Sequence, residues 1–233
     1  PDIHSYIRPG AHAHLVGIGG VSMSPLAEVL HNAGVVISGS DLHESAAVAH
    51  LRALWIPVVI GHRGESVQGA GCVIRTAAVH DDNPEIAAAH AAGIPVFERA
   101  EAWGAIMRRY EHALCVAGTH GKTTTTSMCT HIFLAAQRDP TVMIGGTLPA
   151  LGAGHRVGQG DTIILESCEY CNSFLSFFPT VAVILNVDAD HLDFFKDLED
   201  VKRSFRRFAE LVPQEGCVVA DGDDANTMDA LRG

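Results

Sequence analysis

The sequence predicts an α/β protein with an N-terminal Rossmann-like parallel-sheet domain and a truncated second α/β domain built around a phosphate-binding loop. Short apolar runs alternate with helix-patterned segments through the first 110 residues, which is typical of a parallel, doubly wound sheet. Glycine-rich turns at 17–20 and 118–121 each follow an apolar run and precede a helical pattern. Such turns, placed between a strand and a helix, bind phosphate groups in α/β proteins.

Length and composition set the limits of the interpretation. A chain of 233 residues is long enough for two compact domains, and charged residues at 108–111 mark the expected boundary between domains at 1–110 and 111–233. The net charge of −11 argues against a nucleic-acid surface. Apolar runs are too short to cross a bilayer and no secretory signal is visible, so we expect a cytoplasmic protein with reduced cysteines and no membrane partner.

Elements of the first domain follow from hydrophobic periodicity and turn residues. The predicted strands are 12–18, 35–38, 58–60, 72–76 and 94–97, and the predicted helices are 25–33, 43–54, 84–92 and 99–110.

The first glycine turn is a candidate diphosphate site. Gly17, Gly19 and Gly20 resemble part of a dinucleotide fingerprint, but Ser22 stands where its third glycine is expected. A turn without side chains beside a helix N-terminus still accepts a diphosphate. Asp41, which follows the second strand, is placed either to bond a ribose hydroxyl or base edge or to cap helix 43–54; both roles stay open.

The second domain is predicted from a similar alternation of strand and helix patterns. It consists of a strand at 113–117, a helix at 124–136, a flexible Gly-rich excursion that includes 145–147 and 151–160, strands at 161–165, 181–185 and 217–220, and a helix at 201–211. Glu166 and the acidic segment 188–193 follow two of these strands. Because ligands bind at the carboxyl ends of parallel strands, both should lie on the edge that carries Lys122.

The turn at the start of this domain predicts a nucleoside triphosphate site. Lysine supplies a mobile charge for the terminal phosphates, and the hydroxyl that follows it can ligate Mg²⁺. Two residues separate the glycines where the common pattern has four. The residues expected to hold the nucleotide are Gly118, Thr119, His120, Gly121, Lys122, Thr123 and Thr124.

Five segments together resemble the Mur ligase family, the ATP-dependent enzymes that build the peptidoglycan stem peptide. They are 16–24, 38–42, 117–126, 166–170 and 186–193. The most similar branch joins L-alanine to UDP-N-acetylmuramate through an acyl phosphate. The family has three domains, so the resemblance implies that the amino-acid-binding C-terminal domain is absent here and that this chain alone is competent at most for nucleotide binding.

The resemblance also implies roles for individual residues. Lys122, Glu166 and His191 are the expected catalytic residues, with ATP and Mg²⁺ as cofactors. Thr123 and Glu166 would ligate one Mg²⁺ and His191 a second, although His191 could instead cap a turn. The turn from Gly17 to Ser24 would hold the UDP diphosphate, with Asp41 and His62 near the uridine; a polar loop role for His62 is equally open.

Two departures and three alternatives accompany this interpretation. Ser167 and Cys168 replace a commoner Ala-Asp pair, and Arg206 stands where other branches carry a metal-bridging lysine.

One alternative is the related ligase that adds a recycled tripeptide, whose distinguishing contacts lie beyond this sequence. Another is a nicotinamide-dependent oxidoreductase, which leaves Lys122, Glu166 and His191 unexplained. The third is a binding module that retains the sugar nucleotide without turning it over.

Overall fold

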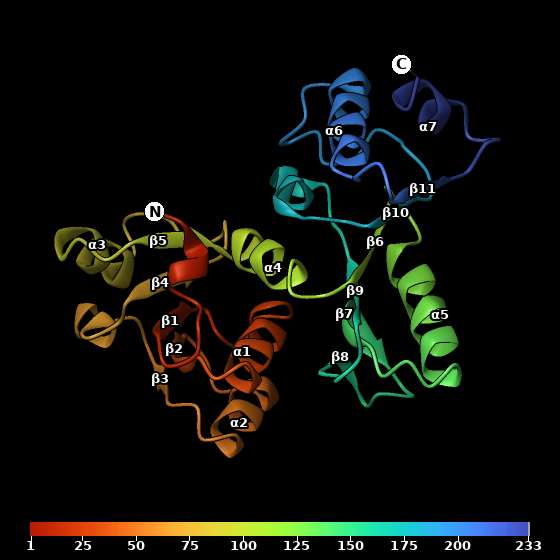
Figure 1. The fold of residues 1–233 in the computed structure, drawn as a ribbon. Coiled ribbons are helices and arrows are strands. Elements are labelled where there is room, and N and C mark those ends of the chain that lie inside the picture. Colours follow the sequence, from red (N-terminus) through yellow and green to blue (C-terminus); the bar gives the residue numbers. More distant parts are fainter. Residues whose placement is uncertain (233) are drawn as a thin grey trace. The chain divides into compact units, whose positions relative to one another are not determined.

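A computed structural model describes residues 1–232 and divides the chain into two compact units, Pro1–Ala105 and Ile106–Gly233. The division falls slightly before the boundary expected at residue 110. Each unit is an α/β structure with its own sheet, as predicted (Figure 1). Among the described residues, no helix combines the length and the apolar character needed to span a membrane.

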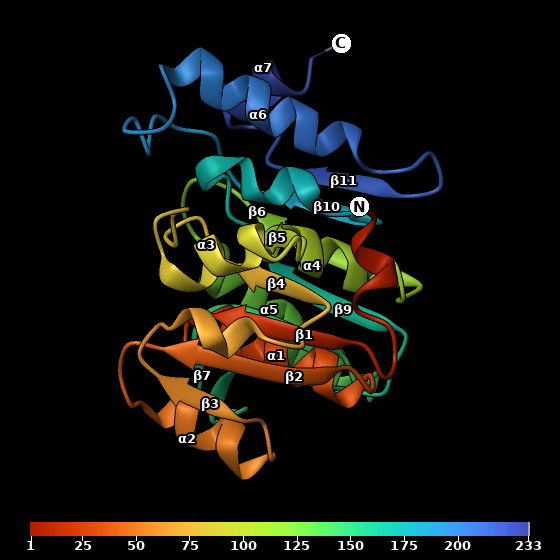
Figure 2. The same cartoon turned by 90° about the vertical axis from the view of Figure 1, so that its left-hand side faces the viewer.

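The first unit contains a five-stranded sheet in the order β3-β2-β1-β4-β5 with all pairs parallel (Figure 2). Its strands are β1 His12–Val16, β2 Val36–Asp41, β3 Val58–Ile60, β4 Cys72–Arg75 and β5 Val96–Glu98. The strand order reverses beside β1, so the carboxyl end of β1 is the position where open α/β sheets bind ligands.

Helices cover both faces of this sheet. They are α1 Met23–Asn32, α2 Ala46–Ala53, α3 Pro84–Ala91 and α4 Arg99–Met107, with short 3₁₀ helices η1 Ile3–Ser5 and η2 Gly64–Val67. Figure 1 shows α1 and α2 on one side of the sheet and α3 on the other. Leu15 of β1 and Leu26 and Leu30 of α1 are fully buried, and the burial of such apolar residues is the main favourable term in the packing.

The second unit contains a six-stranded mixed sheet in the order β11-β10-β6-β9-β7-β8. Its strands are β6 His112–Ala117, β7 Thr141–Leu148, β8 Ala153–Arg156, β9 Thr162–Glu166, β10 Val181–Ile184 and β11 Cys217–Ala220. Its helices are α5 Lys122–Ala135, α6 Leu198–Glu210 and α7 Ala225–Ala230, with the 3₁₀ helix η3 Tyr170–Ser176. Helix α5 packs against β6, β7 and β9 (Figure 1).

The prediction of a flexible segment that includes 145–147 and 151–160 is wrong, because β7 and β8 form an antiparallel hairpin in this part of the chain. Val142, Ile144 and Leu148 of β7 are buried against Ile164 of β9. The glycines that hide the strand in the sequence allow close backbone contact: a Cβ on Gly154 would lie 2.6 Å from the carbonyl oxygen of Gly146.

Helix α6 anchors an aromatic cluster on the second unit. Its buried residues Val201, Ser204, Phe205 and Phe208 recur at helical spacing and form one face. Phe174 of η3 stacks on Phe208 with ring centroids 4.4 Å apart and meets Phe205 edge-on at 5.4 Å. This cluster holds η3, and with it the segment directly after Glu166, against the body of the unit.

Candidate functional site

The phosphate loop joins the carboxyl end of the central strand β6 to the first turn of α5. Gly118 and Gly121 have φ values of 144° and 85°, which disfavour residues with a side chain. A Cβ on Gly118 would also lie 2.9 Å from the Cβ of Leu185. Both glycines are therefore required by the backbone path of the loop.

Asn186, which follows β10, holds the middle of this loop. Its backbone oxygen accepts from Thr119 N at 3.1 Å, and its side chain exchanges two hydrogen bonds with the backbone of His120, at 2.8 and 3.0 Å. The amides of Thr119 and His120 are thus engaged inside the protein. Those of Gly121 and of the first three residues of α5, Lys122–Thr124, have no hydrogen-bond partner in the described chain, which leaves the helix entry for an anion.

The Lys122 ammonium lies over the loop that precedes it. Its Nζ atom donates to the carbonyl oxygens of Gly118 and Thr119 at 2.8 and 3.2 Å and lies 3.4 Å from Oε2 of Glu169. The positive charge is therefore held at the helix entry, close to the open amides.

Thr123 and Glu166 meet beside the same helix end. The Thr123 hydroxyl donates to Glu166 Oε1 at 2.8 Å, and Gly145 N donates to Glu166 Oε2 at 2.5 Å. A Cβ on Gly145 would lie 2.9 Å from Glu166 Oε2, so only glycine leaves room for this carboxylate. A hydroxyl and a carboxylate are the oxygen ligands that Mg²⁺ prefers.

Glu169 is a site residue that the sequence reasoning missed. Its side chain is only 1% exposed, and Oε1 has no hydrogen-bond partner in the described residues. His191 Nε2 lies 3.8 Å from this oxygen, while Lys122 lies beside Oε2. The sequence signal that could have identified Glu169 is its place as the second glutamate of the segment Glu166–Tyr170.

His191 lies in a strained turn. Its φ of 52° is unusual for a residue with a side chain, and such strain concentrates at functional sites. The ring contacts Tyr170, with ring centroids 4.9 Å apart. The Tyr170 hydroxyl donates to Asp193 at 2.9 Å, which raises the pKa of Tyr170. The predicted catalytic residues Lys122 and His191 thus converge on Glu169, and Glu166 bonds Thr123, the residue that follows Lys122.

Arg206 lies outside this cluster. Its side chain donates to the carbonyl oxygens of Ala230 and Asp229 at 2.8 and 3.3 Å, which ties α6 to the last helix, α7.

The first glycine turn is held by two consecutive residues of β2. The Ser40 carbonyl oxygen accepts from Gly17 N and Ile18 N, both at 2.9 Å, and Asp41 Oδ2 accepts from Gly19 N at 2.8 Å. Gly20 N donates to Gly17 O at 3.1 Å. Within residues 1–232, the amides of the turn without a partner are those of Val21 and Ser22, directly before α1.

Of the two roles left open for Asp41, the helix cap is wrong. Ser45 caps α2, because its side chain accepts from Val48 N. Asp41 instead bonds the turn, and a Cβ on Gly19 would lie 2.9 Å from its Oδ2. The short separation explains why residue 19 is glycine.

Ser22 lies at the open end of this turn. Its hydroxyl accepts from Arg99 Nη1 at 2.5 Å, and its carbonyl oxygen accepts from Trp103 Nε1 at 3.2 Å. Arg99, which the sequence reasoning also missed, therefore places a guanidinium beside the two open amides.

His62 contacts a fully buried carboxylate. Its Nδ1 lies 2.8 Å from Glu85 Oε2 and 3.0 Å from the Ser40 hydroxyl, and its side chain is 13% exposed. Burial raises the pKa of Glu85, but hydrogen bonds from His14, Ser40 and His62 outweigh it, so this pKa lies below its ordinary value. Nothing in the sequence pattern distinguished Glu85 from a surface residue at a helix start.

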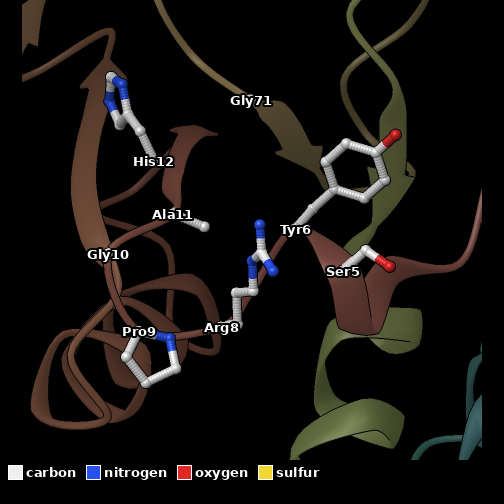
Figure 3. A pocket seen from close by; sticks show the side chains of 8 residues that line it. All are labelled: Ser5, Tyr6, Arg8, Pro9, Gly10, Ala11, His12 and Gly71. Atoms are coloured by element: carbon white, nitrogen blue, oxygen red, sulfur yellow. The ribbon is translucent and has the colours of Figure 1, made fainter.

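A cavity of about 520 Å³ opens near the start of β1, at the strand end opposite the glycine turn (Figure 3). Arg8, His12 and Tyr6 contribute side chains to its lining. It contains none of the residues predicted to bind a ligand.

Comparison with known families matches both units. Residues 12–111 match the family described as "Mur ligase family, catalytic domain", and residues 116–232 match the "Mur ligase middle domain".

Two curated relatives of the chain carry the same name. The chain is 50% identical over 220 residues to UDP-N-acetylmuramate–L-alanine ligase of Caldanaerobacter subterraneus subsp. tengcongensis, covering 94% of this chain and 48% of that protein. It is 48% identical to the enzyme of the same name from Acetivibrio thermocellus, covering 95% and 47%. The chain thus spans about half the length of the curated relatives it matches.

Two solved structures share the fold. The UDP-N-acetylmuramate:L-alanyl-gamma-D-glutamyl-meso-diaminopimelate ligase of Neisseria meningitides gives a TM-score of 0.87 at 28% identity, covering 94% of this chain and 74% of that chain. UDP-N-acetylmuramate-alanine ligase of Thermotoga maritima gives 0.84 at 31%, covering 94% and 51%. The resemblance predicted from the five sequence segments is confirmed, and the chain belongs to the Mur ligase family.

Proposed function

We propose that the protein to which this chain belongs joins L-alanine to UDP-N-acetylmuramate, with ATP and Mg²⁺, in the synthesis of peptidoglycan precursors. One observation carries the ligase chemistry: Lys122, Thr123, Glu166, Glu169 and His191 gather at the open helix entry of the phosphate loop. The name shared by the curated relatives supports the choice of L-alanine. We also place this reaction in the cytoplasm.

The chemistry requires two anions to meet, the muramate carboxylate and the γ-phosphate of ATP. Open amides at Gly121–Thr124 and the Lys122 ammonium would neutralise phosphate oxygens at the helix entry. After the acyl phosphate forms, the amine of L-alanine displaces phosphate at the acyl carbon. Val21 and Ser22 amides at the first glycine turn would hold the diphosphate of the sugar nucleotide.

The donor atoms of the second unit fit Mg²⁺. Thr123 and Glu166 supply oxygen ligands, and the unpartnered buried oxygen of Glu169, next to His191, leaves a further anionic position. When bound, Mg²⁺ would offset negative charge on the phosphates. An imidazole is an unusual Mg²⁺ ligand, and the contact of His191 with Glu169 supports a role in orienting that carboxylate equally well.

The tripeptide-adding ligase is the second candidate, because the Neisseria structure of that class shares the fold with a TM-score of 0.87. Identity to the curated alanine ligases is higher, at 48–50%, which favours L-alanine. Supplying the full-length protein with L-alanine or with the tripeptide, and measuring phosphate release, separates the two. Release with the tripeptide alone would overturn our choice.

Substitution of Lys122 by Ala tests the phosphate loop. In the full-length enzyme we expect turnover to fall at least 100-fold, because the side chain carries the loop's mobile positive charge. Arg207→Ala, on the exposed side of α6, is the matched control and should leave turnover within twofold. Near-normal turnover of Lys122→Ala would remove the loop from the mechanism.

Ligand binding tests the first unit directly. UDP-N-acetylmuramate at a hundred times its dissociation constant should raise the free energy of unfolding of the 233-residue chain by about 2.7 kcal/mol. A shift with NAD and none with the sugar nucleotide would favour the oxidoreductase alternative.

A further inference from the structure

Glu85 lies at the centre of a hydrogen-bonded network that crosses the first unit. Its carboxylate, at the start of α3, is fully buried and accepts on both oxygens. Oε1 lies 3.1 Å from His14 Nε2, while Oε2 accepts from the Ser40 hydroxyl at 2.5 Å and lies 2.8 Å from His62 Nδ1. Burying a carboxylate is costly unless donors surround it, and this one has three.

The network continues along β1 and β2 to the edge of the cavity in Figure 3. The Ser38 hydroxyl lies 2.9 Å from His14 Nδ1 and 2.8 Å from His12 Nε2, and His12 Nδ1 lies 3.2 Å from the Gly69 carbonyl oxygen. A row of four contacts therefore runs from the Gly69 carbonyl to the Glu85 carboxylate, and it ends on an acceptor at both sides.

Counting hydrogens shows what this row lacks. Each contact needs one hydrogen, so the four require four, whereas two neutral imidazoles and one hydroxyl supply three. With both imidazoles neutral, the row is one hydrogen short, so one of its four contacts is not a hydrogen bond. Replacing the carboxylate by an amide would complete the row, because an amide N–H facing His14 supplies the fourth hydrogen.

The contact between His62 Nδ1 and Glu85 Oε2 determines the tautomer of His62. Its Nδ1 faces the Glu85 carboxylate at 2.8 Å, so this nitrogen must carry the hydrogen; a bare nitrogen would place two acceptors together. In the neutral ring, Nε2 then carries a lone pair, and Nε2 has no partner among residues 1–232.

Ser40 connects Glu85 to the glycine turn. Its hydroxyl donates to Glu85, and its carbonyl oxygen accepts from the Gly17 and Ile18 amides. The buried residue Ser40 therefore contacts both the turn expected to bind the diphosphate and His62, which is expected near the uridine.

We propose that Glu85 is a positioning residue of the sugar-nucleotide site: it holds Ser40 beneath the glycine turn and fixes His62 so that Nε2 meets the ligand as a hydrogen-bond acceptor. The ligand must then offer a donor, either the imide N–H of a pyrimidine base or a ribose hydroxyl. The contact between His62 and the nucleotide rests on the proposed function, whereas the hydrogen bonds around Glu85 do not.

Histidine ¹⁵N spectra of the unliganded 233-residue chain at pH 8 test the network without any ligand. We expect His62 to be protonated on Nδ1 and bare on Nε2, and Glu85→Gln to keep this tautomer. A His62 ring protonated on Nε2, or one that averages between tautomers, would overturn the assignment.

Calorimetric titration of UDP-N-acetylmuramate tests positioning. Glu85→Gln keeps an acceptor for Ser40 and His62 and should bind within threefold of the parent chain. Glu85→Met removes that acceptor and should raise Kd at least tenfold, whereas the exposed control Glu65→Gln should leave Kd unchanged. Unchanged binding by Glu85→Met, or a tenfold loss in Glu85→Gln, contradicts the proposal. If Glu85→Met fails to fold, Glu85→Gln and the spectra decide.

Nucleotide analogues identify the donor. N3-methyl-UDP lacks the imide hydrogen, and the 2′-deoxy and 3′-deoxy forms of UDP each lack one ribose hydroxyl, so the group that His62 contacts is the one whose loss weakens binding. If no analogue binds more weakly than UDP, His62 is not an acceptor for the ligand. If the parent chain binds no UDP compound, the proposed function fails, while the ¹⁵N spectra still decide the role of Glu85.

Discussion

At the scale of single residues, the two units bury carboxylates in different ways. Glu85 has donors on both oxygens, whereas Glu169 has one oxygen near Lys122 and the other without a hydrogen bond. A satisfied buried carboxylate fixes its neighbours in one arrangement. A carboxylate with an unused oxygen retains the capacity to take a cation, which is why we place Glu169 in the second site.

The lowered pKa of Glu85 predicts how stability depends on pH. Because the folded pKa lies below the ordinary value of 4.5, the carboxylate stabilises the folded chain above that pH, and this contribution is lost as the pH falls through the folded pKa. We expect the unfolding free energy of the parent chain to decrease more steeply below pH 4.5 than that of Glu85→Gln.

Chemical denaturation of both chains between pH 3 and pH 7 measures this difference. Asp224 and Asp229 also have lowered pKa values, but they contribute equally to both curves and do not affect the difference. Parallel curves would show that Glu85 binds protons alike in the folded and unfolded chains.

Burial also predicts the reactivity of the cysteines. It raises the pKa of Cys72 and of Cys115 to about 12, so neither thiol ionises near neutral pH, whereas Cys217 is exposed on β11. Iodoacetamide at pH 7.5 should modify Cys217 in the folded chain and reach the other two only after unfolding. Modification of Cys72 at the rate of Cys217, followed by mass spectrometry, would show that the first sheet opens.

At the scale of elements, each glycine turn is supported by the strand beside it. Residues 40 and 41 of β2 engage the amides of the first turn, and Asn186 after β10 engages those of the second. Among the described residues, the amides of both turns that remain unpaired lie at the entry of the following helix, where the helix dipole favours an anion.

Gly145 of β7 tests whether Glu166 must stay beside Thr123. A methyl group at residue 145 would lie about 3 Å from both carboxylate oxygens, so Gly145→Ala should displace Glu166 and weaken Mg²⁺–ATP binding to this chain at least tenfold. Gly222→Ala is the matched control, because its methyl group meets no atom within 4 Å. Calorimetric titration measures both; equal affinities would show that Glu166 does not need this position.

At the scale of the whole molecule, each unit has its own sheet, core and anion-binding turn. The described chain is therefore expected to unfold in two transitions rather than one. UDP-N-acetylmuramate should raise the midpoint of one transition and Mg²⁺–ATP that of the other, which differential scanning calorimetry resolves. A single transition that both ligands shift equally would show that the units unfold together.

Much of the fold could be predicted because local patterns repeat along the chain. Alternating apolar runs and helix signals predicted the parallel sheet of the first unit, and the strand–glycine–helix order predicted the loop that ends at Lys122. The hairpin β7–β8 escaped because Gly145, Gly146 and Gly154 suppress the strand signal, and only pairing with β9 reveals it.

The sequence by itself determined the family and the candidate residues of both turns, because these depend on short motifs whose chemistry is local. Only the tertiary structure decided which amides remain open, that Asp41 bonds the glycine turn, and that Glu85 and Glu169 are buried beside histidines. Burial and pairing of a charge depend on residues distant in the chain, such as His14 and Glu85, and no local pattern records which of them will meet.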